Sequence, residues 1–254
     1  MGKSRNKKLT MVRASNSDLV EHELITNVIN SQDEQDGITV KQTQITFRTP
    51  NQKIFWDMMG NKEISIGVGS AGTGKTYLAC AKALELMLYT HKDIYKQIIL
   101  TTPAQTADNE QIGFLPGTLD EKMMPHVYSM VYIFEKILGK VKAERFMHAE
   151  KIKILPLAYM RGINIDNAIL ICDEAQNMTK KQMKTMLTRI GENSKFIITG
   201  DLEQQDKKFG KSEENGLLFV MENLTDIQQI GLFEFQPDDV VRNKVIPLIL
   251  NKFN

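Results

Sequence analysis

The sequence predicts a three-layer α/β fold with a mainly parallel central sheet. A strand-like segment at 63–68 runs through a glycine-rich turn into a helical pattern at 77–88. A second apolar segment, at 168–172, is followed at once by two acids. Further apolar segments alternate with helical patterns along the chain, which is typical of a parallel sheet covered by helices. With 254 residues, 42% of them hydrophobic, the chain can bury a sizeable core.

The glycine-rich turn has the pattern of a phosphate-binding P-loop, G-x-x-x-x-G-K-[ST]. Its glycines let backbone N–H groups converge on phosphate oxygens, and the start of the next helix adds partial positive charge. We expect the lysine of the turn to reach the β- and γ-phosphates and the final threonine hydroxyl to hold Mg²⁺. The residues predicted to bind the triphosphate are Gly69, Ser70, Ala71, Gly72, Thr73, Gly74, Lys75 and Thr76, and Thr76 is also a metal ligand.

The acids after the second apolar segment predict the catalytic half of the same site. Asp173 is expected to bind Mg²⁺ through its water shell, and Glu174 to orient and deprotonate an attacking water. The alternative is that both are solvated acids at a strand end. Adjacent carboxylates after a buried strand, downstream of a P-loop, favour the catalytic interpretation.

Two glutamines stand near the expected site in the sequence. Gln204 follows a strand end, where a sensor of the γ-phosphate is needed. Gln52 opens a helix just upstream of the P-loop, and its amide matches the adenine edge, although a polar residue at a helix start explains it equally well.

Short apolar runs predict the remaining strands of the sheet, which are 38–47, 96–100, 152–155, 194–199 and 227–235.

Composition bounds the organisation of the chain. Residues 1–37 are polar with segregated charge and predict a loosely ordered arm, whereas 38–254 predict a single folded domain. The formal net charge of +1 excludes a strong global field toward DNA or membranes.

Cys80 and Cys172 lie in apolar segments and predict core thiols. Because no apolar run is long enough to span a membrane, we expect a soluble, cytoplasmic protein.

Taken together, these motifs resemble the PhoH-like family of P-loop ATPases, which is related to the core domain of superfamily 1 helicases. The resemblance implies a RecA/helicase-like fold, ATP and Mg²⁺ as ligands, Gln52 as the adenine contact, Gln204 as the phosphate sensor and Arg242 as an arginine finger. It looks like the short, phage-type version, without an appended RNA-binding or nuclease domain. The motifs that carry it are 69–79, 113–117, 121–122, 156–162, 173–177, 199–204 and 239–242.

Two positions depart from the family pattern, because Thr102 and Ile163 stand where arginines are usual. Arg242 could act in its own chain or in a neighbour, which leads to the hypothesis of a homo-oligomer, a hexameric ring being one form. The resemblance implies hydrolysis of ATP coupled to translocation on, or remodelling of, single-stranded nucleic acid, RNA rather than DNA. The alternative is a nucleotide-switched protein-binding module without motor activity. A small-molecule kinase is disfavoured because Glu174 is placed for water.

Overall fold

The computed structural model describes residues 45–103, 119–205, 209 and 213–241, of which 119–122 by their backbone alone. It also describes the backbone of three short strands nearer the N-terminus, β1 Ile25–Thr26, β2 Gln32–Asp33 and β3 Ile38–Thr39. β1 pairs antiparallel with β4 Ile45–Thr46, and β2 with β3. Within the strand predicted over 38–47, the structure describes β3 and β4 as strand. Arg242 and the predicted motif at 113–117 lie outside the described residues.

Six strands form one parallel sheet in the order β10-β5-β9-β8-β6-β7, which confirms the predicted fold class. In this order β9 lies between β5, which leads into the glycine turn, and β8, which leads into the acidic pair. The two motifs thus emerge at the same edge, one strand apart. The strands are β5 Ile64–Val68, β6 Gln97–Thr101, β7 Ile152–Ile154, β8 Ala168–Cys172, β9 Lys195–Gly200 and β10 Ile230–Glu234.

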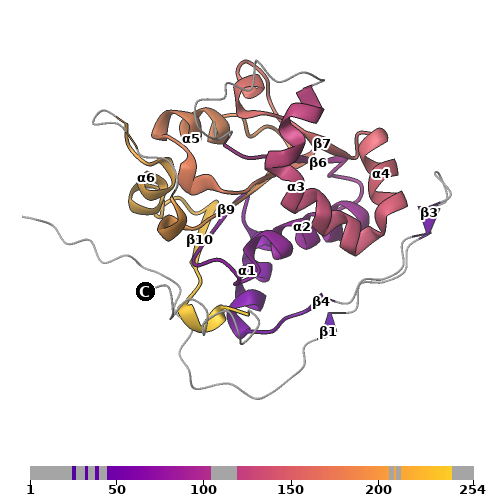
Figure 1. Cartoon of the computed structure of the whole chain (residues 1–254), viewed down its shortest axis with the longest axis horizontal. Helices are drawn as coiled ribbons and strands as arrows, with labels where there is room; N and C mark the ends of the chain where they lie inside the picture. The colour runs from indigo at the N-terminus through magenta and orange to yellow at the C-terminus, as the bar shows by residue number, and fades with distance from the viewer. Residues whose placement is uncertain are drawn as a thin grey trace, which may run out of the picture.

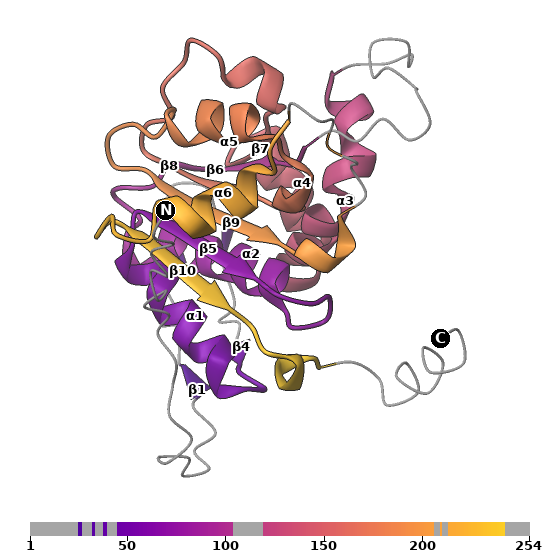
Figure 2. The same ribbon diagram turned by 90° about the vertical axis from the view of Figure 1, so that its left-hand side faces the viewer.

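Helices cover both faces of this sheet (Figures 1 and 2). On one face lie α1 to α4, and on the other lie α5 and α6. A π-helical turn at Leu86–Thr90 continues α2. The helices are α1 Pro50–Asn61, α2 Lys75–Glu85, α3 Leu119–Leu138, α4 Lys140–His148, α5 Lys180–Leu187 and α6 Gly216–Asn223.

The core consists of two apolar clusters, one on each face of the sheet. In β6, Ile98 and Leu100 pack with the α1–α4 side, whereas Ile99 packs with the α5–α6 side. In β8, Ile169 and Leu170 divide in the same way. Because both faces are covered, β5, β8 and β9 are buried along their whole length. The sequence of β8 is apolar throughout, whereas Ser65 interrupts β5 and β9 contains Lys195 and Thr199.

Helix starts follow local capping chemistry. Thr49 caps α1, with its hydroxyl accepting a hydrogen bond from the Gln52 N–H at 3.3 Å. The spacing of Thr179 and Gln182 in the sequence predicts a capping box, and the structure has one at the start of α5. A cap at Ser212 is the expectation for the next helix, and it is wrong. That helix starts at Gly216, and its cap is Asn215, whose side chain accepts from the Leu218 N–H at 3.0 Å.

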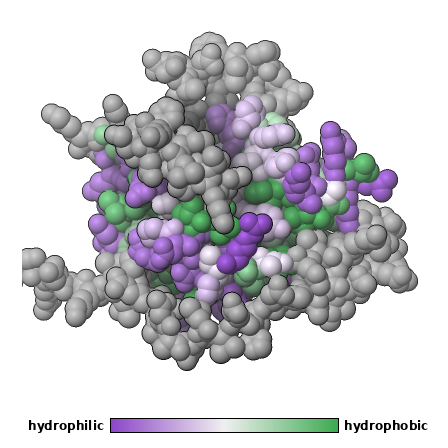
Figure 3. Space-filling model, turned by 60° about the horizontal axis from the view of Figure 1, so that its bottom comes forward, coloured by the Kyte–Doolittle hydropathy of each residue, from purple (hydrophilic) through white to green (hydrophobic). Residues whose placement is uncertain are grey.

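The surface of the described part is mixed in character. On the face shown in Figure 3, hydrophobic and hydrophilic residues are interspersed where the structure is described.

Within the described ranges, no helix combines the length and the apolar character needed to cross a bilayer. The expected cytoplasmic localisation stays a prediction.

Candidate functional site

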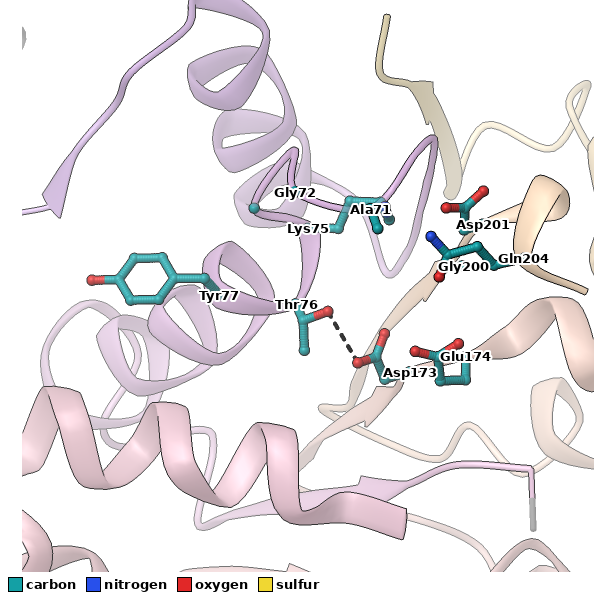
Figure 4. A pocket seen from close by; sticks show the side chains of 11 residues that line it. Ala71, Gly72, Lys75, Thr76, Tyr77, Asp173, Glu174, Gly200, Asp201 and Gln204 are labelled. Atoms are coloured by element: carbon teal, nitrogen blue, oxygen red, sulfur yellow. Dashed lines mark hydrogen bonds between the residues drawn. The ribbon is translucent and has the colours of Figure 1, made fainter. Parts of the chain in front are cut away.

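A cavity of about 210 Å³ lies at the carboxyl edge of the sheet, between the glycine turn and the ends of β8 and β9. Figure 4 shows the Asp173 and Glu174 carboxylates facing it from one side and the turn from the other, whereas the Tyr77 ring points away. Three segments far apart in the chain therefore meet here. The lining residues are Ala71, Gly72, Gly74, Lys75, Thr76, Tyr77, Asp173, Glu174, Gly200, Asp201 and Gln204.

The glycine turn needs its glycines for its backbone shape. Gly69, Gly72 and Gly74 have φ of 144°, 92° and 86°, values at which a side chain is strained. At position 69 an added Cβ would also lie 2.8 Å from Cβ of Phe235. The Lys75 ammonium bends back over the turn and donates to the carbonyls of Gly69 at 2.5 Å and Ser70 at 2.9 Å. The turn thus holds a buried cation beside the cavity.

The acidic half is joined to the turn by a hydrogen bond. The Thr76 hydroxyl, at the start of α2, donates to Asp173 Oδ2 at 3.0 Å (Figure 4). Thr199 on the intervening strand β9 donates to Oδ1 of the same carboxylate at 2.6 Å. Both oxygens of Asp173 are therefore oriented by threonines from neighbouring elements. A hydroxyl and a carboxylate are oxygen ligands that suit Mg²⁺, which takes its remaining ligands from water and substrate phosphates.

Glu174 has a strained backbone and an anchored side chain. Its φ of 58° lies in the left-handed region, which is uncommon for a residue with a side chain and is concentrated at functional sites. Its carboxylate is exposed at the cavity and accepts a hydrogen bond from Gln176 Nε2 at 2.6 Å. The strand end therefore holds this acid in one direction beside Asp173.

Gln176 is a residue whose role the sequence did not reveal. It is 0% exposed, and its amide connects three parts of the site. Besides Glu174, Nε2 donates to the Gln204 carbonyl at 3.3 Å, and Oε1 accepts from the Asp201 N–H at 3.0 Å. The only available signal was an amide two residues after the acidic pair. Gln176 thus ties the acid to the segment after β9.

That segment brings two further polar side chains to the cavity. Gln204 lies in a short 3₁₀ turn at Leu202–Gln204 and is exposed. Asp201 is 6% exposed, and its Oδ1 accepts from the Glu203 N–H at 3.1 Å. Among the described residues, its buried Oδ2 has no hydrogen-bond partner. Since buried acceptors are normally paired, this oxygen is suited to a donor on a ligand or its water shell.

The other predicted positions lie apart from the cavity lining. Gln52 is buried behind the turn, with its amide bonded to backbone groups of Arg48 and Thr73. Its adenine contact stays a prediction. Of the two positions where the family usually has arginine, Thr102 is buried, whereas Ile163 is exposed.

Both cysteines are buried free thiols among the α2 and β8 side chains, as predicted. Burial, and after it the negative charge of Asp173, raises the pKa of Cys80 and of Cys172. The two thiols therefore stay protonated and pack as small apolar groups. They belong to the core and contribute no ionised group to the cavity.

A parallel sheet that delivers a glycine turn with its lysine to one carboxyl edge defines the class of the molecule, a P-loop α/β protein. The chain belongs to the PhoH-like protein family, whose profile matches residues 44–254. This membership supports a nucleotide-binding or nucleotide-hydrolysing role.

The chain is 42% identical over 214 residues to a PhoH-like protein of Bacillus subtilis (strain 168), covering 84% of this chain and 65% of the relative. It is 36% identical over 212 residues to Protein PhoH of Escherichia coli (strain K12), covering 83% and 58%. The chain thus spans about three fifths of these relatives. Among solved structures, Pif1 helicase from Candida albicans is similar over 80% of this chain and 42% of its own, with 15% identity and a TM-score of 0.41.

Proposed function

We propose that this chain binds ATP with Mg²⁺ and hydrolyses it, and that hydrolysis is coupled to translocation on, or remodelling of, single-stranded nucleic acid, RNA rather than DNA. The observation that carries the ATPase half is the hydrogen bond from Thr76 to Asp173. It joins residues 97 positions apart in the chain at one cavity. One belongs to the phosphate-binding turn and the other to the acidic pair, which is the pairing that a metal-bound triphosphate requires.

The glycine turn provides the phosphate-binding half. Its backbone N–H groups and the α2 N-terminus favour an anion, and the Lys75 ammonium can exchange the carbonyls of the turn for phosphate oxygens. Thr76 and Asp173 would hold Mg²⁺, which when bound neutralises charge on the phosphates. Asp201 Oδ2 offers a further acceptor to the water shell of the metal.

Glu174 would take the proton of the attacking water, because its carboxylate faces the cavity next to Asp173 (Figure 4). Gln176 keeps that carboxylate aimed, and Gln204 would sense the terminal phosphate from the 3₁₀ turn. Arg242 lies outside the described residues, and its role as arginine finger is part of this proposal. The residue before it, Val241, donates to the Gly72 carbonyl of the turn at 2.9 Å.

Family membership and one surface feature support the nucleic-acid half. On α3, Tyr128 and Tyr132 are exposed and stack with ring centroids 6.3 Å apart, and Lys136 lies 5.0 Å from the second ring. Exposed aromatic faces next to a cation are typical of surfaces that bind single strands by stacking.

The test is an ATPase assay with and without single-stranded RNA and DNA, on wild type and Glu174→Gln. Stimulation by single strands, RNA above DNA, is expected. Hydrolysis that no single strand stimulates would favour the nucleotide-switched protein-binding module. Phosphate transfer to a small acceptor would instead indicate a kinase.

The homo-oligomer is a further part of the proposal, and its test is sedimentation with and without ATP. We expect assembly beyond the monomer, because Arg242 of a neighbouring subunit could then act as the arginine finger. Such a finger raises the rate of hydrolysis by about 10³-fold or more. A monomer with full ATPase activity would remove the oligomer from the account.

A further inference from the structure

The start of α1 lies directly behind the glycine turn. Gln52 is 6% exposed, and both ends of its side-chain amide are bonded to backbone. Oε1 accepts from the Arg48 N–H at 2.8 Å, and Nε2 donates to the Thr73 carbonyl at 2.9 Å. An added Cβ at Gly74 would lie 3.2 Å from this nitrogen, so the amide is also in close contact with the next residue of the turn. The side chain that could read a base is thus held against the loop from both ends.

A second segment holds the same turn from outside. Asn51, the neighbour of Gln52, donates to Asp239 Oδ2 at 2.8 Å, and the Gln236 N–H donates to the same oxygen at 2.8 Å. Two residues after this buried aspartate, the Val241 N–H donates to the Gly72 carbonyl at 2.9 Å. Two consecutive carbonyls of the turn, those of Gly72 and Thr73, are therefore held by groups outside it.

Holding these carbonyls fixes the N–H groups that would meet phosphate. In a planar trans peptide the C=O and the following N–H point in opposite directions, and the described residues contain no cis peptide. When Gln52 holds the Thr73 carbonyl outward, the N–H of Gly74 must point the other way. Gly74 lines the cavity, and a run of N–H groups turned toward one space is what makes an anion-binding nest.

We propose that Gln52 is a positioning residue of the phosphate site, acting on the triphosphate through the Thr73 peptide and independently of the nucleobase. This rests on the proposed function, because it assumes that the turn binds a triphosphate. It differs from recognition of adenine in a measurable way. A residue that reads the base matters only for ligands that have one, whereas a residue that shapes the turn matters for any ligand with the same phosphates.

The experiment measures dissociation constants of ATP, GTP and inorganic tripolyphosphate, each with Mg²⁺, by calorimetry on the full chain. For Gln52→Ala we expect all three to weaken by the same factor, about three- to tenfold, the value of one hydrogen bond. Gln52→Met keeps the length of the side chain and adds no charge, but it can neither donate to the Thr73 carbonyl nor accept from the Arg48 N–H, and it should weaken the three ligands by a similar factor. Gln228→Ala removes an exposed amide before β10, at the opposite edge of the sheet, and is the matched control. It should change none of the three dissociation constants.

The alternatives give different results. If Gln52→Ala weakens ATP but leaves tripolyphosphate and GTP unchanged, Gln52 reads adenine and the proposal is overturned. If no ligand is affected by either variant, the tether is irrelevant to binding and the proposal is equally overturned. A wild type that binds none of the three would instead refute the proposed function. Melting temperatures confirm that each variant is folded, and Gln52→Met decides the question should Gln52→Ala fail to fold.

Discussion

The two ends of the same sheet both bury lysines, but in different surroundings. At the carboxyl edge, Lys75 lines a cavity that is also lined by an acidic pair. At the amino edge, Lys195 on β9 donates to the carbonyls of Gly60 and Lys62 at the end of α1. Nearby, Lys82 on α2 forms an ion pair with Glu85 at 2.7 Å and lies 4.6 Å from the Trp56 ring centroid.

The difference shows what separates a functional cluster of charges from a structural one. The Lys82 and Lys195 ammonium groups contact other protein groups, and these contacts hold α1, α2 and β9 together. Burial, and after it the charge of Lys82, lowers the pKa of Lys195 to about 8. At the carboxyl edge the lysine is also bonded to backbone carbonyls, but the cation and the acids lie around a space that a ligand can enter. Substitutions there should change binding and turnover, whereas those at the amino edge should change stability and its pH dependence.

The largest effect is expected from Glu174→Gln. An amide cannot take a proton from water, so turnover should fall about 10²- to 10⁴-fold while nucleotide binding persists. Steady-state ATPase rates and calorimetric ATP binding measure the two quantities. Glu222→Gln, an exposed position on α6, is the control and should leave both unchanged. Turnover within twofold of wild type in Glu174→Gln would remove this residue from the chemistry.

Lys75→Ala should act on binding before turnover. It removes a charge-assisted contact to phosphate, so ATP should bind about 10- to 100-fold more weakly, with a small change in melting temperature. Calorimetry measures the affinity, and thermal unfolding the stability. A variant that unfolds early but binds ATP normally would place Lys75 with the structural lysines of the opposite edge.

Lys195→Met should act on stability alone and depend on pH. In the unfolded chain this lysine has its ordinary pKa of 10.5, against about 8 in the folded state. Between these values the unfolded state binds more protons, so the free energy of unfolding rises with pH. The variant should lack this part of the rise, on the order of 1 to 2 kcal/mol after allowance for solvent screening.

Urea unfolding from pH 7 to 10.5 measures that rise. Other groups titrating in this range are present in both proteins, so their contribution cancels in the difference. Lys153→Met, at a lysine on β7 whose side chain is 42% exposed, is the control and should keep the wild-type slope. An unchanged slope in Lys195→Met would contradict the lowered pKa.

The last prediction concerns stability at neutral pH and Lys82→Met, which removes the ion pair with Glu85 and the contact with the Trp56 ring. Because the pair is largely buried, leaving the Glu85 carboxylate without its partner should cost about 3 kcal/mol of unfolding free energy at neutral pH. Because the charge of Lys82 depresses the pKa of Lys195, that pKa should move upward in the variant. ATP turnover should stay at the wild-type value. A large loss of turnover in a folded variant would contradict the assignment of the amino edge to stability alone.

What the sequence predicts well is what local pattern determines. The six strands of the sheet follow from apolar runs, the capping box at Thr179 from its spacing, and the glycine turn from a motif whose residues are contiguous. The placement of Asp173 beside Thr76 required a spatial inference that the strand order supports, since only β9 separates the two strands.

What the sequence does not predict depends on groups that the fold brings together. The role of Gln176 rests on three partners supplied by two strand ends, and no spacing reveals it. Likewise, the sequence offers the Gln52 amide to a base or to its helix start, and only the packing of α1 behind the turn bonds it to Thr73. For α6 the local pattern predicts a cap at Ser212, but the fold places the helix start at Gly216 and the cap at Asn215.

The central claim is that the turn and the acidic pair serve one metal-bound triphosphate, and a double-mutant cycle tests it directly. ATP affinity is measured with and without Mg²⁺ for Thr76→Val, Asp173→Asn and the double variant. If both side chains act on the same ion, each single change should remove most of the gain that Mg²⁺ gives, and the double change should remove little more. Losses that simply multiply, or a Mg²⁺ gain that survives in Asp173→Asn, would contradict the account.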